Sequence, residues 1–121
     1  MGEANNGIKR DPNCIFCRII AREIPAKFVF EDESAVAIRD INPQAPTHVL
    51  IIPKDHVANL LEAKDHAFLG AMMAKASDVV KHDELDSGFR VVVNTGNDGG
   101  QTVHHLHIHV LGGRAMHWPP G

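Results

Sequence analysis

The chain of 121 residues lacks several features that would assign it to a broad class of protein. No apolar run approaches the roughly 20 residues needed to cross a bilayer, and the polar N-terminus has no secretory apolar segment. The 12 Lys and Arg residues are scattered and the net charge is -3, so there is no basic stripe for a nucleic-acid polymer. We therefore expect a cytoplasmic or nuclear protein that binds neither membranes nor nucleic-acid polymers, although a small phosphate ligand would fit.

Cysteine is also scarce, because the only two, Cys14 and Cys17, are three positions apart. In a reducing compartment this spacing suggests a metal site or a redox pair before a structural disulfide.

The length and the 44% hydrophobic content favour one domain with one core. We predict a mobile, polar N-terminal segment over residues 1–12, a single domain over 13–121, and an irregular C-terminal tail over 112–121.

Hydrophobic spacing predicts the secondary structure. Apolar residues recur at helical intervals over 14–22 and 64–84, which indicates a short N-terminal helix and a long amphipathic one. Short or alternating apolar runs predict strands at 28–31, 35–39, 48–53, 89–94 and 103–111. The first two of these read as a hairpin, and the third should be central because it is apolar on both faces. The expected class is α+β, with the long helix on one face of a mostly antiparallel sheet.

The last predicted strand contains His105-Leu106-His107-Ile108-His109, in which histidines alternate with apolar residues. Side chains of a strand point to alternate faces, so the three imidazoles should share one face. Histidine titrates near neutrality and serves as nucleophile, proton donor or metal ligand. The pattern is therefore compatible with a metal site or with covalent catalysis.

A loop with three glycines, residues 94–102, precedes these histidines. Glycine lets backbone N–H groups approach an anion, and Gln101 and Thr102 add side-chain donors. A glycine-rich turn can equally be a plain hairpin connection. Beside a row of imidazoles, we interpret it as a candidate phosphate cradle.

Residues 100–114 resemble the signature of the histidine-triad (HIT) family, in which histidines alternate with apolar residues. Residues 40–48, 51–54 and 116–121 are similar to its Hint branch, the purine nucleoside phosphoramidases. The similarity extends from about Cys14 to the last residue. It implies a HIT-like fold, a homodimer and a purine nucleotide substrate with an AMP-like product.

The resemblance also implies an activity: hydrolysis of the P–N bond of purine nucleoside phosphoramidates, such as AMP-amines, with no cofactor required. His107 would attack the α-phosphorus to form a nucleotidyl-histidine, a step that suits a neutral imidazole. His105 would orient His107, and His109 would contact the phosphoryl oxygens or assist proton transfer to the amine. The other residues that the resemblance assigns to substrate binding are Asp40, Ile41, His48, Asn94, Gly100, Gln101, Thr102 and Trp118.

Asp40 and Trp118 have more specific expected roles. By resemblance Asp40 would bind the ribose hydroxyls, although a loop aspartate near prolines is more often a turn-former. Trp118, the only tryptophan, lies in a tail that would reach the neighbouring subunit's site.

The cysteine pair has the gap that lets two thiolates bind one tetrahedral metal, but two more ligands are required. The resemblance supplies them as His56 and His105, which would complete a structural zinc site. Alternatively, Cys14 and Cys17 are small core residues of a short helix.

Two other functions are compatible with the sequence. A dinucleoside polyphosphate hydrolase would use the same covalent chemistry but needs room for a second nucleotide. A nucleotide-binding interaction module would hydrolyse its ligand only incidentally.

Overall fold

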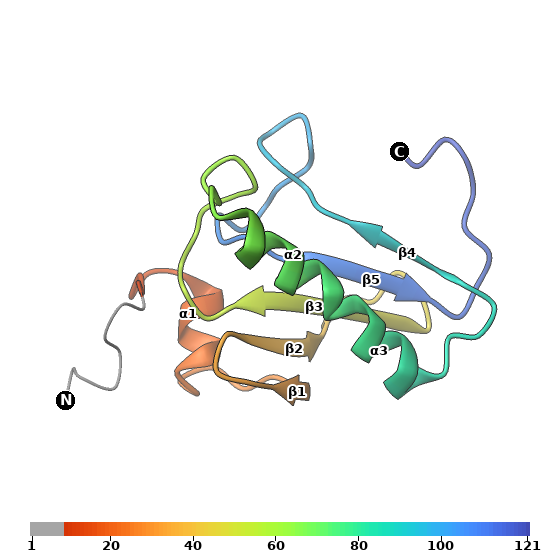
Figure 1. The fold of residues 1–121 in the computed structure, drawn as a ribbon, viewed down its shortest axis with the longest axis horizontal. Coiled ribbons are helices and arrows are strands. Elements are labelled where there is room, and N and C mark those ends of the chain that lie inside the picture. Colours follow the sequence, from red (N-terminus) through yellow and green to blue (C-terminus); the bar gives the residue numbers. More distant parts are fainter. Residues whose placement is uncertain (1–8) are drawn as a thin grey trace.

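The computed structural model describes residues 9–121, so most of the predicted mobile segment lies outside the described residues and its mobility stays a prediction. Figure 1 shows a five-stranded sheet with helices on both faces. In chain order the elements are α1 (Ile15–Ile20), β1 (Phe28–Glu31), β2 (Ala35–Arg39), β3 (Thr47–Pro53), α2 (His66–Ala74), α3 (Ala76–Asp83), β4 (Phe89–Val92) and β5 (Ile108–Gly112).

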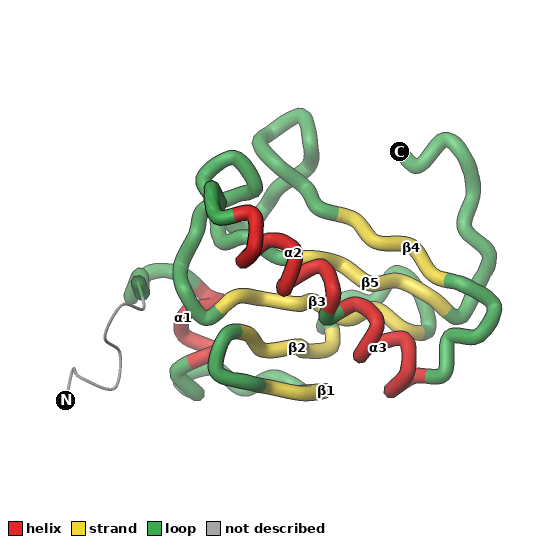
Figure 2. Tube along the Cα trace, viewed as in Figure 1, coloured by secondary structure: helices red, strands yellow, loops and turns green. Residues whose placement is uncertain are grey.

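The sheet is antiparallel throughout and has the order β1-β2-β3-β5-β4 (Figure 2). Its middle strand, β3, is buried along its whole length, because it is apolar on both faces and each face is covered. The predicted α+β class and the central position of this strand are thereby confirmed.

Two apolar clusters lie on the two faces of the sheet. On one face, Leu50 and Ile52 of β3 pack with α1. On the other, Val49 and Ile51 pack with α2 and α3, which cross the sheet in Figure 1. Because side chains alternate along a strand, His48 lies on the α1 face and Thr47 on the α2/α3 face.

The predicted long helix consists of α2 and α3, joined at Lys75, whose backbone stays helical. The helix begins at His66 rather than at Lys64 because the Asp65 side chain accepts hydrogen bonds from the N–H groups of Ala67 and Phe68. An ion pair from Lys75 to Asp32 attaches the joint to the turn between β1 and β2.

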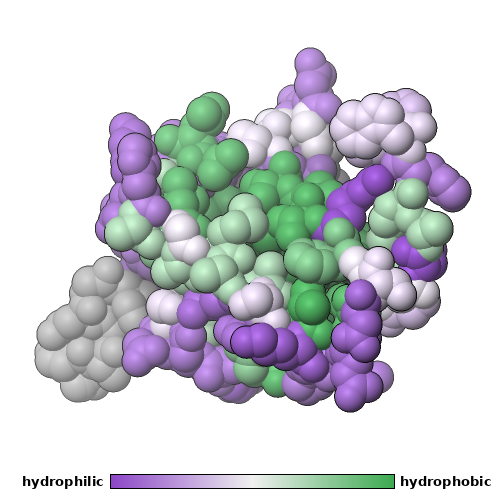
Figure 3. All heavy atoms as spheres, turned by 45° about the vertical axis from the view of Figure 1, so that its right-hand side comes forward, coloured by the Kyte–Doolittle hydropathy of each residue, from purple (hydrophilic) through white to green (hydrophobic). Residues whose placement is uncertain are grey.

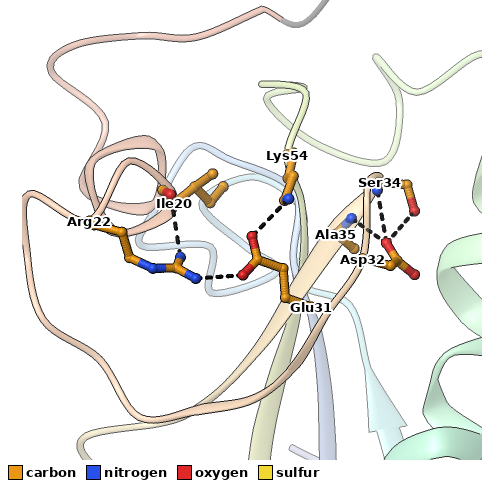
Figure 4. A network of polar contacts seen from close by, with 7 residues as sticks. All are labelled: Ile20, Arg22, Glu31, Asp32, Ser34, Ala35 and Lys54. Carbon is orange, nitrogen blue, oxygen red and sulfur yellow. Dashed lines mark hydrogen bonds and ion pairs between the residues drawn. The ribbon is translucent and has the colours of Figure 1, made fainter. Parts of the chain in front are cut away.

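Carboxylates fix the predicted hairpin (Figure 4). Asp32 accepts hydrogen bonds from the backbone N–H groups of Ser34 and Ala35, which closes the turn. Glu31 binds both Arg22, which follows α1, and Lys54, which follows β3. These contacts hold α1 against the sheet.

Several predicted boundaries are wrong. The short helix ends at Ile20 because Arg22 takes a positive φ of 67°. The strand predicted over 89–94 ends at Val92, and the histidine strand begins only at Ile108 and runs to Gly112, where the tail was predicted to begin. The segment before Ile108 leaves the sheet because Leu106 N–H donates to the Val57 carbonyl of a neighbouring loop.

No helix within residues 9–121 is long and apolar enough to cross a membrane.

Candidate active site and metal site

The three histidines, which were predicted to share one face of a strand, lie on the α1 side of the sheet, although only His109 belongs to a regular strand. His105 and His107 both pack edge-on against the ring of Phe16 in α1, with centroid distances of 5.9 and 5.0 Å. The rings of His107 and His109 are 5.0 Å apart. The alternation therefore persists beyond the hydrogen-bonded ladder.

Within residues 9–121, His107 has one ring nitrogen in a hydrogen bond and one without a protein partner. Its Nδ1 lies 2.7 Å from the carbonyl oxygen of His105, which can only accept, so Nδ1 carries the proton. The lone pair is then on Nε2. Burial lowers the pKa of His107, which keeps the ring neutral and nucleophilic at pH 7.

His109 is oriented by a chain of hydrogen bonds. The backbone N–H of Gln44 donates to Nδ1 of His48 at 3.1 Å, so His48 carries its proton on Nε2. That nitrogen lies 2.9 Å from Nδ1 of His109 and donates to it, which leaves the His109 proton on Nε2. Burial, followed by the neighbouring His107 and His48, lowers the pKa of His109 to about 4.

Asp40 stands beside this chain, with Oδ2 3.4 Å from Nε2 of His48. Its other oxygen accepts from the N–H of Asn42 at 2.8 Å, so the carboxylate also shapes its own turn. Asp40, Ile41 and His48 line a cavity of about 710 Å³. Ile41 is 96% exposed, so its side chain is free to contact a ligand.

The glycine-rich loop is braced mainly by its own side chains. Gln101 is buried, with its amide donating to the carbonyls of Ala58 and Val103 and accepting from Gly96 N–H. Asn94 donates to the Gly99 carbonyl, and Gly100 takes a φ of 79° that favours glycine. Thr102 is exposed. Asn94 and Gln101 thus shape the loop, whatever contact they make with a ligand.

The predicted tail residue is apart from this group. Trp118 is 83% exposed, and the tail is attached to its own chain through Arg90, which donates to the His117 carbonyl. Nothing within residues 9–121 covers the indole.

The four predicted metal ligands converge. The sulfurs of Cys14 and Cys17 and one nitrogen each of His56 and His105 all lie within 4.8 Å of one another. The His105 Nδ1 is 3.2 Å from the Cys14 sulfur, 3.6 Å from the Cys17 sulfur and 3.1 Å from the His56 Nδ1. Tetrahedral zinc with these ligands requires edges of about 3.3–3.8 Å, so the cluster fits a structural zinc ion.

The polarity of the surrounding hydrogen bonds also suits a cation. The His105 Nε2 lies 2.8 Å from the Pro53 carbonyl and donates to it, so Nδ1 offers a lone pair to the cluster. Burial raises the pKa of the Cys17 thiol to about 11, so zinc binding there must displace a proton. His105 links the two sites, because its ring belongs to the cluster and its carbonyl orients His107.

Asp40, His48 and His109 also lie within 4.8 Å of one another. The Gln44 N–H occupies the His48 Nδ1, and the His48 Nε2 proton points to His109, so neither nitrogen of His48 offers a free lone pair. This second group is therefore built as a hydrogen-bonded chain and not as a metal site.

Sequence reasoning missed three contributors. Phe16 of α1 packs against His105 and His107, and its only signal in the sequence was its place in the predicted helix. The Pro53 carbonyl and the Gln44 N–H are backbone groups, so the amino-acid sequence does not reveal their roles.

The α+β fold and its row of histidines beside a Cys₂His₂ cluster define a histidine-triad protein. The model of the HIT domain matches residues 21–116, so the chain belongs to the HIT family. It is 50% identical over 115 residues to a maize protein named 14 kDa zinc-binding protein, covering 92% of this chain and 90% of that one.

Solved structures agree with this assignment. A HIT family hydrolase from Legionella pneumophila superposes with a TM-score of 0.87 at 48% identity, covering 90% of this chain and 100% of that one. A histidine triad nucleotide-binding protein from Candida albicans gives a TM-score of 0.77 at 33% identity, covering 88% and 83%. The chain thus shares the fold of HIT family hydrolases.

Proposed function

We propose that this protein is a purine nucleoside phosphoramidase of the Hint branch that works through a covalent nucleotidyl-His107. The observation that carries the proposal is the hydrogen bond between His107 Nδ1 and the His105 carbonyl in a buried site, because it places the ring proton on Nδ1 and leaves Nε2 as the nucleophile. Membership of the HIT family and the name of the Candida albicans relative support a nucleotide substrate.

In the first step Nε2 of His107 attacks the α-phosphorus, and the bond from phosphorus to the amine breaks. An anionic phosphate beside His109 favours uptake of a second proton from solvent at Nδ1 of that ring, and the His48 Nε2 proton is then donated to Asp40 Oδ2, 3.4 Å away, instead of to His109. His109 then gives one proton to the departing amine, while His107 keeps its Nδ1 proton on the His105 carbonyl.

In the second step water attacks the same phosphorus and gives a proton to His109. The bond between phosphorus and Nε2 of His107 breaks, which releases the mononucleotide and restores both histidines. Imidazole suits this cycle because it is a competent nucleophile and also a good leaving group.

The nucleoside would occupy the cavity beside Asp40. A carboxylate there can accept hydrogen bonds from both ribose hydroxyls, and the exposed Ile41 offers an apolar surface for the base. Thr102, which is exposed, and the backbone N–H groups near Gly100 would contact the phosphate. The product would be AMP or a related purine mononucleotide.

We infer that the working form is a homodimer. Strand β4 is at the edge of the sheet, where it can pair with another chain, and Phe89 of β4 and Met73 of α2 are each 46% exposed. The face drawn in Figure 3 has apolar side chains grouped at its centre and in its upper part. A partner subunit would also provide a surface against which the exposed Trp118 could pack. We expect the dimer to be cytoplasmic or nuclear.

The proposal is tested by the variant His107→Asn, with His104→Asn as the matched control because His104 is a neighbouring but exposed histidine. Hydrolysis of an AMP-amine should fall by several orders of magnitude in His107→Asn, while AMP still binds and His104→Asn keeps its activity. Retained turnover in His107→Asn would remove this residue from the nucleophile role. A wild-type protein that binds AMP but hydrolyses no phosphoramidate would instead be an interaction module.

A further inference from the structure

Asp83, the last residue of α3, makes a dense set of contacts to the sheet. Its two oxygens lie 2.5 and 2.9 Å from the guanidinium nitrogens of Arg39, and one of them accepts from the Thr47 hydroxyl at 2.7 Å. His82 also contacts this carboxylate. The Asp83 side chain is only 11% exposed, and the Arg39 guanidinium holds its pKa well below the usual range.

The partners of Asp83 have a special position along the chain. Arg39 ends β2 and Thr47 begins β3, so the two residues are the roots of the loop over 40–46. The next residue after each root is a candidate site residue: Asp40 follows Arg39, and His48 follows Thr47.

Alternation within the strands separates the two sets of side chains. Arg39 and Thr47 reach Asp83 on the face covered by α3, whereas His48 points to the face that holds His109. Asp40 and His48 are also joined by their backbones, since the Asp40 N–H donates to the His48 carbonyl at 2.9 Å. The contacts of Asp83 with Arg39 and Thr47 on the α3 face therefore fix the positions of Asp40 and His48 on the opposite face.

From this geometry we propose that Asp83 is a positioning residue for the nucleoside side of the site. It holds Arg39 and Thr47 together, and it thereby sets the placement of Asp40 and the hydrogen bond from His48 to His109. The inference rests on the proposed function only in that AMP is taken as the ligand of the cavity. It concerns ligand placement and not the bond-breaking step.

The structure supplies a matched control. Lys75, at the joint of α2 and α3, forms an ion pair with Asp32 in the turn between β1 and β2. This pair also ties the helix layer to the sheet, but at the opposite end of β2 from Asp40. Lys75→Met should lower thermal stability without touching the loop over 40–46.

The experiment compares Asp83→Asn, Thr47→Val, Thr47→Ser and Lys75→Met in the full chain. The first readout is the dissociation constant of AMP by calorimetry. The second is the tautomer of His48 and His109 from the ¹⁵N shifts of their rings, which does not depend on turnover. Thr47→Val is the smaller change and keeps the test decisive if Asp83→Asn fails to fold.

We expect Asp83→Asn and Thr47→Val to weaken AMP binding about tenfold or more, because a displacement near 1 Å is enough to lose well-oriented contacts. The single tautomer of His109 should give way to a mixture. Thr47→Ser should restore both readouts, and Lys75→Met should leave them within twofold of the wild type.

Native AMP affinity and a single His109 tautomer in Thr47→Val would overturn the inference. Equal losses in Lys75→Met and Asp83→Asn would do so too, because they would reduce Asp83 to a general stabilising contact. The phosphoramidase proposal itself fails if His107→Asn retains turnover or if the wild type hydrolyses no phosphoramidate, and in either case the AMP and tautomer readouts still decide the role of Asp83.

Discussion

Removal of zinc is the perturbation whose effect follows most directly from the structure. The four ligand atoms come from α1 and its N-cap residue, from the segment after β3 and from the histidine segment, so the ion would join parts of the chain that are up to 91 residues apart. An ion that binds only the folded state at 1,000 times its dissociation constant stabilises it by about 4.1 kcal/mol. For a chain of this size that corresponds to roughly 10–20 °C in Tm.

The assay pairs metal analysis with thermal unfolding of protein purified without chelator. We expect about one zinc per chain and a fall in Tm of the size given above when a strong chelator is added. Cys17→Ser should lose the metal and the chelator effect together, because it removes one of four ligands. His104→Asn should keep both, because this exposed neighbour of His105 is not among the four.

A wild-type protein that holds less than about 0.2 zinc per chain with both thiols reduced, and whose Tm does not change with chelator, has no structural zinc site. The cysteines would then be small core residues that pack α1 against the sheet.

Two further predictions concern pH. Burial lowers the pKa of His107. The acid limb of kcat/KM for an AMP-amine should therefore lie below about pH 6.5, which is the ordinary pKa of histidine. An acid limb above pH 7 would contradict a neutral, buried nucleophile. His109 has a folded pKa of about 4, below its unfolded value, so the stability it contributes is complete above about pH 6.5 and is lost as the pH falls toward 4. Denaturant unfolding of wild type and His109→Asn should therefore show a smaller loss in the variant over this range, and parallel curves would count against a buried neutral His109.

Much of the fold could be predicted from hydrophobic spacing. The hairpin strands match the predicted ranges because polar residues between two apolar runs admit few alternatives. The long helix was predicted as one segment, and the structure forms it as α2 and α3 joined at Lys75. The end of α1 at Ile20 depends on a positive φ at Arg22, and the start of β5 at Ile108 depends on a hydrogen bond to Val57. Neither cause can be recognised from the neighbouring residues in the sequence.

The site was predictable in its residues but not in its hydrogen bonds. Alternation placed His107 and His109 on one face, and the cysteine spacing indicated half of a metal site. The tautomers depend on the Gln44 N–H and on the carbonyls of Pro53 and His105, which only the folded backbone brings into place. Asp83 was missed because its contacts join α3 to β2 and β3 across long sequence separations.

The central claim is that Nε2 of His107 forms a covalent bond to the α-phosphorus of the substrate. The most direct test is rapid acid quenching of the protein with an AMP-amine, followed by digestion and mass spectrometry to locate a nucleotidyl adduct. We predict an adduct of one AMP unit on His107, absent from His107→Asn. An adduct on His105 or His109, or full turnover with no adduct at any time point, would contradict the account.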